Sequence, residues 1–183
     1  FADKPMVINS EGFELLKNTF KTAKEKDLLV YDIMTERFEI STMLQKALSQ
    51  IPSVFGELEK GTIENPAVTK ESVHHFFKYV SGSPLTRPAW FFDVTQEGEG
   101  IVDVTTHLVD LVQWECFPEQ IIDTNAVNVL EAKRWPTVLT KDDFQKVTKL
   151  DEYPDYLSPY IADNKLSSYS NGEINYTING VHA

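Results

Sequence analysis

The stretch GEGIVDVTTHLVDLVQW, residues 98–114, carries the most information about the fold and the chemistry of this chain. A glycine-rich turn precedes apolar residues that recur every three or four positions, which predicts an amphipathic helix over residues 101–114. One face of this helix carries Ile101, Val104, Leu108 and Leu111, and another carries Asp103, His107, Asp110 and Trp114. The first face is expected to pack on a core, and the second to hold any reactive groups.

Asp103 lies one helical turn before His107, so the two side chains are neighbours on the helix surface. A carboxylate beside an imidazole fixes its tautomer and raises its basicity, which suits general acid–base catalysis near neutral pH. Such a pair is also common as a capping or surface pair without catalytic function, and the residues alone leave both interpretations open. Asp110 is expected to be structural, bonded to the backbone or to an arginine.

Elsewhere the hydrophobic pattern predicts a mixture of helices and strands. Helices are expected over about residues 10–26 and 38–50, and from residue 69 or 70 to about residue 80. Strands are expected over about residues 28–34, 54–63, 127–134, 138–139 and 173–178. No regular strand–helix–strand rhythm persists. The predicted class is therefore α+β, with a mixed, largely antiparallel open sheet covered by helices on one face.

The composition limits the partners that the chain can have. It has 183 residues, 42% of them hydrophobic, which is enough for a sizeable core. Its 17 basic and 28 acidic side chains give a net charge of -11, and the acidic residues are scattered along the sequence. Such a field repels phosphate backbones, so no nucleic-acid binding is expected. No apolar run approaches the ~18 residues of a membrane span.

Motifs for nucleotide phosphates and for metals are scarce. No Gly-x-Gly-x-x-Gly fingerprint or phosphate loop is present, so no phosphate cradle is predicted within this chain. The single cysteine, Cys116, excludes an intrachain disulfide and a cysteine-based zinc cluster. His74 and His75 are adjacent in sequence and would point about 100° apart on a helix, so they cannot chelate one ion together.

Three segments, in this order, resemble the Gfo/Idh/MocA family of NAD(P)-dependent oxidoreductases. Ala2-Asp3-Lys4-Pro5 resembles the Glu-Lys-Pro motif that ends the family's Rossmann half, with Asp3 in place of glutamate. Glu36-Arg37-Phe38 resembles its arginine-containing turn, and residues 98–110 resemble its glycine-rich turn and Asp-x-x-x-His-Leu-x-Asp helix. The interval before Asp103 is long, which implies an insertion around residues 65–90.

The resemblance implies that residues 1–183 are a single catalytic domain fragment, and that a Rossmann domain precedes it in the full-length protein. The implied fold is that of the glyceraldehyde-3-phosphate-dehydrogenase-like C-terminal domain, complete or truncated. It implies hydride transfer to or from a sugar- or polyol-like carbinol, with Lys4, Asp103 and His107 as catalytic residues. Arg37, Trp90 and Asp110 are expected to bind substrate, and Lys4 and Pro5 to face NAD or NADP. No metal is expected, and no cofactor is expected to bind tightly to this chain alone.

Two other classes of function stay open on the sequence. One is a non-catalytic binding or oligomerisation module with the same fold, because members of the family pair through the open face of the sheet and a homo-oligomer is expected. The other is a metal-dependent hydrolase that uses Asp103, His107 and Asp110, with or without His74. The expected location is the cytoplasm, or the periplasm if an export signal precedes Phe1.

Overall fold

The computed structural model describes residues 1–183 and is an α+β fold. Its α-helices are α1 (Ser10–Glu25), α2 (Ile40–Ser49), α3 (Pro52–Phe55), α4 (Val94–Glu97), α5 (Val102–Cys116) and α6 (Lys141–Thr148). Its strands are β1 (Tyr79–Val80), β2 (Ser83–Pro84), β3 (Val127–Leu139), β4 (Ile161–Ala162), β5 (Lys165–Ile178) and β6 (Val181–His182). Short 3-10 helices are η1 (Thr35–Phe38), η2 (Ala89–Phe92), η3 (Thr124–Ala126) and η4 (Asp155–Tyr160).

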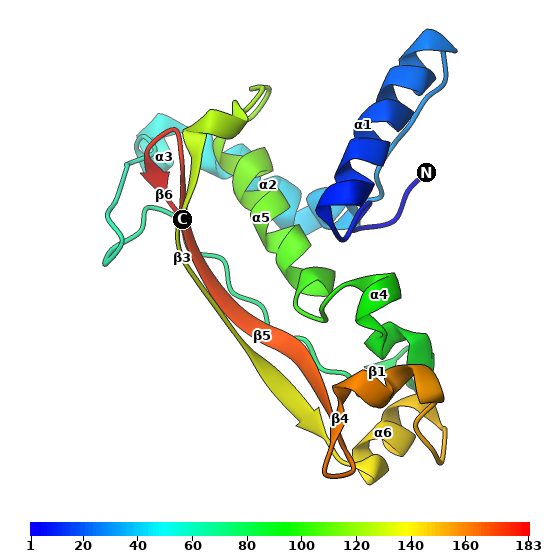
Figure 1. Ribbon diagram of the computed structural model, residues 1–183. Helices are drawn as coiled ribbons and strands as arrows, with labels where there is room; N and C mark the ends of the chain where they lie inside the picture. The colour runs from blue at the N-terminus through cyan, green and yellow to red at the C-terminus, as the bar shows by residue number, and fades with distance from the viewer. The chain divides into compact units, whose positions relative to one another are not determined.

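The long strands β3 and β5 pair with each other in the larger sheet, in which β5 is central and β3 is an edge strand. They lie side by side in Figure 1, in the order β3-β5-β4, and β6 also pairs with β5. The pairings of β5 with β4 and with β6 are antiparallel, as is the separate pair β1-β2. The predicted α+β class with an antiparallel sheet and packed helices is confirmed.

The chain divides into two compact units, each built from segments that are distant in the sequence. Unit 1 contains residues 1–72, 105–133 and 173–183, and unit 2 contains residues 73–104 and 134–172. The elements α5, β3 and β5 each begin in one unit and end in the other. The prediction that residues 1–183 form a single domain stays a prediction.

Unit 1 opens with two segments that run parallel to each other, one before α1 in the sequence and one after it. Ala2 bridges Asp32 in the parallel sense, with Ala2 N donating to Tyr31 O at 2.8 Å and Ile33 N donating to Ala2 O at 3.1 Å. Parallel segments need a crossover, and α1 supplies it. The helix begins at an Asn9 cap whose side chain accepts from Gly12 N.

Unit 1 also contains α2, which runs alongside α5 in Figure 1. The contacts between the two helices come from the polar face of α2. Gln45 bonds to the Glu115 carboxylate, Gln50 bonds to the Glu115 carbonyl, and the Lys46 ammonium lies over the Trp114 ring. The apolar positions of α2, by contrast, are exposed, with Ile40 at 76% and Leu44 at 57%. The core of unit 1 lies on the other side of α5, around Val112, Phe117, Tyr176, Ile178 and Val181.

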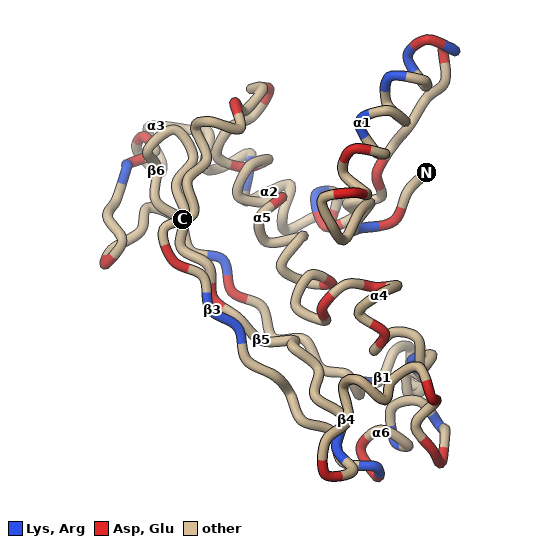
Figure 2. Tube along the Cα trace, viewed as in Figure 1, with Lys and Arg blue, Asp and Glu red and all other residues tan.

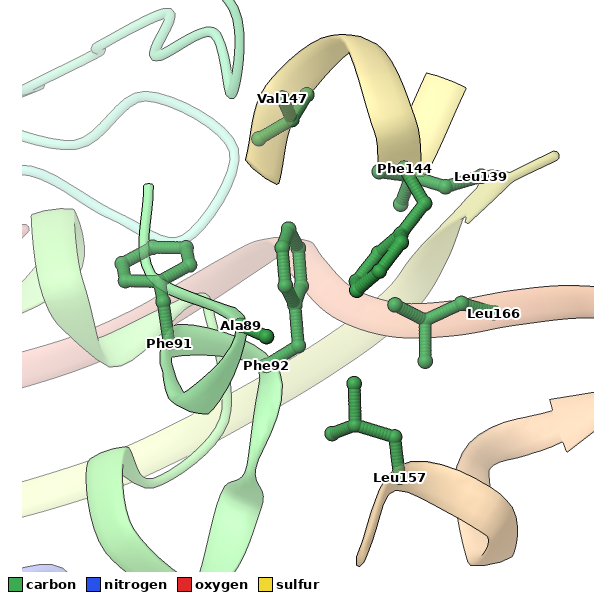
Figure 3. Packing of buried hydrophobic residues seen from close by; sticks show 8 residues of the cluster. All are labelled: Ala89, Phe91, Phe92, Leu139, Phe144, Val147, Leu157 and Leu166. Atoms are coloured by element: carbon green, nitrogen blue, oxygen red, sulfur yellow. The ribbon is translucent and has the colours of Figure 1, made fainter. Parts of the chain in front are cut away.

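The core of unit 2 is aromatic and is shown in Figure 3. Phe92 lies between Phe91 and Phe144, with ring centroids 5.3 Å and 5.8 Å apart, and Leu157 and Leu166 close the cluster. Phe144 is contributed by α6, which starts with a reciprocal capping box between Thr140 and Asp143. The η2 and α6 segments therefore form one packed body with the start of β5.

The predicted helices over residues 10–26, 38–50 and 101–114 are confirmed as α1, α2 and α5. The predicted strands over residues 127–134 and 138–139 are one continuous strand, β3, and the strand over residues 173–178 is the end of β5. The predicted strand over residues 28–34 is wrong, because only Asp32 pairs, through its bridge to Ala2.

Two further predictions are wrong because local turn residues override the hydrophobic pattern. The strand predicted over residues 54–63 is absent, since Pro52 starts the helical turn α3 and Gly56, at φ 77°, ends it. The helix predicted from residue 69 or 70 to about residue 80 does not form, and the end of this segment is instead one strand of a β-hairpin. Ser81 and Gly82 both have positive φ, as a type I′ hairpin turn requires, so Tyr79–Val80 pairs with Ser83–Pro84.

Acidic residues are distributed along the whole chain rather than gathered in one segment, as Figure 2 shows. None of the helices combines the length and the hydrophobicity that a membrane crossing requires.

Candidate functional site

The start of α5 is held by a close contact between its glycine turn and β5. Gly98 ends α4 at φ 78°, a left-handed conformation that favours glycine. Ile101 N donates to Tyr169 O at 2.9 Å, and a Cβ on Gly100 would come within 3.0 Å of Ser168 Oγ. Glu99 forms an ion pair with Arg134 beside this turn. The glycines thus fix where α5 begins and so where its polar face starts.

His107 on α5 contains an unsatisfied buried atom. Its Nδ1 is buried and has no hydrogen-bond partner. Leaving a buried polar group unpaired costs about 1–3 kcal/mol, so such atoms are rare and often belong to functional groups. Nδ1 is the nitrogen that would donate a hydrogen bond to a carboxylate if that carboxylate oriented the imidazole for proton transfer.

Arg37 and Asp110 form a two-pronged ion pair. Arg37 Nε donates to Asp110 Oδ2 at 2.7 Å, and Arg37 Nη2 donates to Asp110 Oδ1. Both side chains are mostly buried, with 27% and 16% of their surfaces exposed. The hydrogen bond from Arg37 to Asp110 raises the pKa of the guanidinium, and attraction to Asp110 adds to this effect. Asp110 is thus bonded to an arginine, as its structural interpretation predicted.

An open pocket of about 330 Å³ adjoins this ion pair. Its lining includes Arg37, Asp110, Trp114, Phe117, Glu119 and Gln120. The Lys46 ammonium lies 3.9 Å from the centroid of the Trp114 ring and helps to hold it in place. The polar face predicted for residues 101–114 therefore borders a pocket at its C-terminal end.

Glu115, one residue beyond this face, is buried at 5% exposure. Its Oε2 accepts from Lys70 Nζ at 2.6 Å and from Gln45 Nε2 at 2.9 Å, while its Oε1 has no partner. Burial, followed by the nearby Glu115 charge, raises the pKa of the Cys116 thiol. This cluster joins α5 to α2 and to the segment that carries Lys70.

Asp103 lies in unit 2, where its carboxylate is 3.8 Å from His74 Nδ1. On the other side of that imidazole, His74 Nε2 lies 3.0 Å from Lys78 Nζ and 3.2 Å from Arg87 Nη2. Arg87 also donates to Phe76 O, and burial lowers its pKa. His74 is thus a partner of Asp103, a contact that the sequence did not predict. The pairing of Asp103 with His107 stays a prediction.

The remaining predicted site residues lie outside the α-helices and strands. Trp90 is on η2 of unit 2, with 46% of its surface exposed beside the buried Phe91 and Phe92. Lys4 is half-buried in unit 1, next to the Ala2–Asp32 bridge, and the Lys4–Pro5 peptide bond is cis.

No three histidine, cysteine, aspartate or glutamate side chains converge to hold a metal ion. The metal-dependent hydrolase that used Asp103, His107 and Asp110 therefore has no ligand set here.

Comparison with known proteins places the chain in a family. Residues 44–183 match the family described as "Putative oxidoreductase C terminal domain". A crystal structure of a putative oxidoreductase from Parabacteroides merdae ATCC 43184 is 56% identical, with a TM-score of 0.93. The match covers 99% of this chain and 42% of that one, so the chain spans less than half the length of this relative. No curated protein matches the chain.

The match extends over most of the chain, and the chain therefore belongs to this family of oxidoreductase C-terminal domains. The resemblance drawn from Lys4, Arg37 and the helix at residues 101–114 agrees with this result, and the C-terminal oxidoreductase prediction is confirmed.

Proposed function

We propose that this chain is the substrate-holding, catalytic part of a nicotinamide-dependent oxidoreductase that acts on a sugar- or polyol-like carbinol. The observation that supports this most is the buried, unpartnered Nδ1 of His107 in a chain of an oxidoreductase domain family. A histidine that keeps one nitrogen unsatisfied in a packed helix is unfavourable for stability alone, which favours a role in proton transfer.

In this proposal, NAD or NADP bound to the full-length protein would supply the hydride-transfer chemistry. His107 takes the hydroxyl proton as the carbinol carbon loses its hydride, so that charge does not accumulate on oxygen. The proposal assigns the role of orienting the imidazole to Asp103, which lies one turn away on the same helix and whose carboxylate is 3.8 Å from His74 Nδ1 in this structure. The Lys4 ammonium would stabilise the developing alkoxide, and Lys4 and Pro5 would hold the nicotinamide end of the cofactor.

The substrate-binding part of the proposal uses Arg37, Asp110 and Trp90. The Arg37–Asp110 pair offers hydroxyl groups both donors and acceptors beside the open pocket. The Trp90 indole is half exposed and suits stacking on the apolar face of a sugar ring. The chain has no phosphate cradle of its own, so the nucleotide is expected to be held mainly by other parts of the full-length protein.

The test is a His107→Asn variant of the full-length protein, assayed by nicotinamide absorbance with a panel of sugars and polyols. Asparagine keeps hydrogen-bonding capacity but cannot transfer a proton, so turnover is expected to fall by about 10²–10⁴-fold. His75→Asn, an exposed histidine, is the matched control and is expected to keep wild-type turnover. Unchanged turnover in His107→Asn would remove the catalytic assignment.

A second measurement tests where the cofactor binds. NAD and NADP are titrated by calorimetry into the 183-residue chain and into the full-length protein. Binding by the full-length protein alone supports a cofactor cradle outside these residues. Tight binding by the 183-residue chain would contradict the proposal that the cofactor is held mainly by other parts of the full-length protein.

A second candidate, an oligomerisation module, is favoured by the surface of β3. This strand exposes apolar side chains, among them Val127 at 38% and Val129 at 61%, which lie on the same face of the strand. Exposed apolar side chains along one strand are typical of an interface. If a homo-oligomer forms through the sheet, Val129→Lys should dissociate it in sedimentation velocity, whereas Leu15→Lys on α1 should not.

A further inference from the structure

We propose that His74 is a positioning residue for Asp103, the carboxylate at the start of α5. In this role the His74 imidazole is neutral, its Nδ1–H group faces Asp103, and two cations hold its other nitrogen. The role rests on the proposed function, because it assumes that Asp103 contributes to turnover. It adds a residue from outside α5 that fixes where this carboxylate lies.

The protonation of the His74 ring follows from its two cationic neighbours. His74 Nε2 lies 3.0 Å from Lys78 Nζ and 3.2 Å from Arg87 Nη2. An ammonium and a guanidinium can only donate hydrogen bonds, so Nε2 has to accept and carries no proton. A neutral imidazole with a bare Nε2 keeps its proton on Nδ1. Lys78 and Arg87 therefore select the tautomer in which Nδ1 is a donor.

This Nδ1 donor faces the Asp103 carboxylate. His74 Nδ1 lies 3.8 Å from Asp103 Oδ2, and the two side chains are only 31% and 15% exposed. The separation is longer than a direct hydrogen bond, but hydrogen bonds in catalytic sites are often long until the substrate binds. A carboxylate can accept several hydrogen bonds through its two oxygens. A contact with His74 is therefore compatible with the role proposed for Asp103 toward His107.

The support behind His74 reaches into the aromatic core of unit 2. Arg87 Nε donates to Phe76 O at 3.2 Å, and its guanidinium lies 4.3 Å from the centroid of the Phe91 ring. Phe76 in turn packs edge-on against Phe91 and Phe92, two of the rings in Figure 3. All of these residues, like Asp103, lie in unit 2. The imidazole is thus held by a packed body, which a precisely placed polar group requires.

The same contacts favour positioning over proton transfer by His74 itself. A general base needs a nitrogen within hydrogen-bond reach of the proton that it takes from the substrate. In His74 the nitrogen without a proton is Nε2, and it already accepts from Lys78 and Arg87. The ring is therefore suited to a fixed donor for Asp103 rather than to an acid–base cycle.

The test is a double-mutant cycle on the full-length protein, assayed with the sugar or polyol of the panel above that turns over fastest. His74→Ala should lower kcat about tenfold and leave KM within about twofold, because it removes positioning rather than a substrate contact. In an Asp103→Asn background the same change should have little further effect, since the two residues act as a unit. An equal loss in both backgrounds, or an unchanged kcat in His74→Ala, would overturn the inference.

Two conservative variants separate positioning from packing, and circular dichroism checks that each variant is folded. The amide of His74→Asn places an N–H donor near the position of Nδ1, so this variant should recover most of kcat. In His74→Gln the amide lies near the position of Nε2, and kcat should stay low. His75→Asn, at the neighbouring exposed histidine, should keep the wild-type kcat. Failure of His74→Asn to recover kcat would overturn the assignment of Nδ1 as the donor.

A second measurement does not depend on turnover. Imidazole nitrogen NMR of the full-length protein, labelled on histidine, reports which ring nitrogen carries the proton. The His74 signals, assigned by their loss in His74→Asn, should show a protonated Nδ1 and a bare Nε2 at neutral pH, and should shift in Asp103→Asn. A proton on Nε2, or signals that do not respond to Asp103→Asn, would overturn the inference.

The outcomes also separate this inference from the proposed function. Turnover that is lost in His107→Asn and kept in His74→Ala would overturn the role of His74 alone. Absence of nicotinamide-dependent turnover in the wild type would overturn the proposed function, and the NMR measurement would still decide whether His74 holds Asp103.

Discussion

Tyr176 shows how one buried polar atom affects stability. Its hydroxyl is buried without a hydrogen-bond partner, and burial raises the pKa of the phenol to about 12. Tyr176→Phe removes the unpaired hydroxyl and keeps the ring. We expect the free energy of unfolding at neutral pH to stay unchanged or to rise by about 1 kcal/mol. Urea unfolding followed by circular dichroism measures this, and a loss above about 1 kcal/mol would reveal a partner for the hydroxyl.

The same phenol predicts a pH dependence with a definite sign. The pKa of Tyr176 is higher in the folded than in the unfolded chain, so the folded state holds this proton more tightly. The stability that this difference adds is fully present below about pH 10. It is then lost as the pH rises from about 10 to about 12. The alkaline fall in stability should therefore be smaller in Tyr176→Phe. Identical alkaline profiles for the two proteins would contradict this.

Lys70 neutralises the buried carboxylate of Glu115. Lys70→Met leaves that charge without its cation, so we expect a loss of about 3–5 kcal/mol in urea unfolding at neutral pH. The double variant Lys70→Met/Glu115→Leu removes both charges and should recover most of the loss. If the double variant were no more stable than Lys70→Met, packing rather than charge would explain the effect.

These residue contacts also show what the sequence could and could not predict about the site. The order of Asp103, His107, Asp110 and Trp114 on one helix face follows from local spacing, and α5 has the expected helical span. The partners of that face do not follow from spacing. Arg37 lies 73 residues before Asp110 and Lys70 lies 45 residues before Glu115, so only the folded chain brings them together. Arg37 was singled out by its motif, whereas Lys70, Lys78 and Arg87 had no local signal.

At the scale of elements, α6 depends on its capping box. Thr140 Oγ1 accepts from Asp143 N, and Asp143 accepts from Thr140 N at 3.0 Å. Thr140→Ala removes the cap, and we expect a loss of about 1 kcal/mol in the free energy of unfolding. Thr140→Ser keeps the hydroxyl and is the matched control. The hydrogen bonds from Thr140 also lower the pKa of Asp143, so this contribution is present at neutral pH and is lost as the pH falls through that pKa.

The same element shows why some helices were predicted and others were missed. The amphipathic pattern is long in α1, α2 and α5, and these were predicted. In α6 the helix has only eight residues, and its signal was the cap rather than a hydrophobic repeat. The false helix after residue 69 had apolar residues at helical spacing, but Phe76 and Phe77 pack on the aromatic core of unit 2 from a bend in the chain. Tertiary packing and the Ser81–Gly82 turn therefore prevent a helix in this segment.

At the scale of the molecule, each compact unit has its own core. Phe144 is fully buried in unit 2, and Phe144→Ala should cost about 3–5 kcal/mol there. We expect hydrogen exchange to speed up most in peptides that cover residues 141–148 and 155–166. Peptides that cover Val112 and Ile178 in the core of unit 1 should change less. An equal increase in both sets would show that the two cores unfold as one cooperative block.

The packing of α2 predicts an unusual tolerance to mutation. In an ordinary amphipathic helix the apolar positions are restricted and the polar ones tolerant, and in α2 we expect the reverse. Its polar residues Gln45 and Gln50 make the contacts with α5, whereas Ile40 and Leu44 contact little in this chain. In a saturation scan of residues 40–50 of the 183-residue chain, read out by the yield of folded protein, the polar positions should be restricted. Ile40 and Leu44 should accept polar residues freely. If the scan gives this result, a rule that ranks positions by hydrophobicity would misjudge this helix.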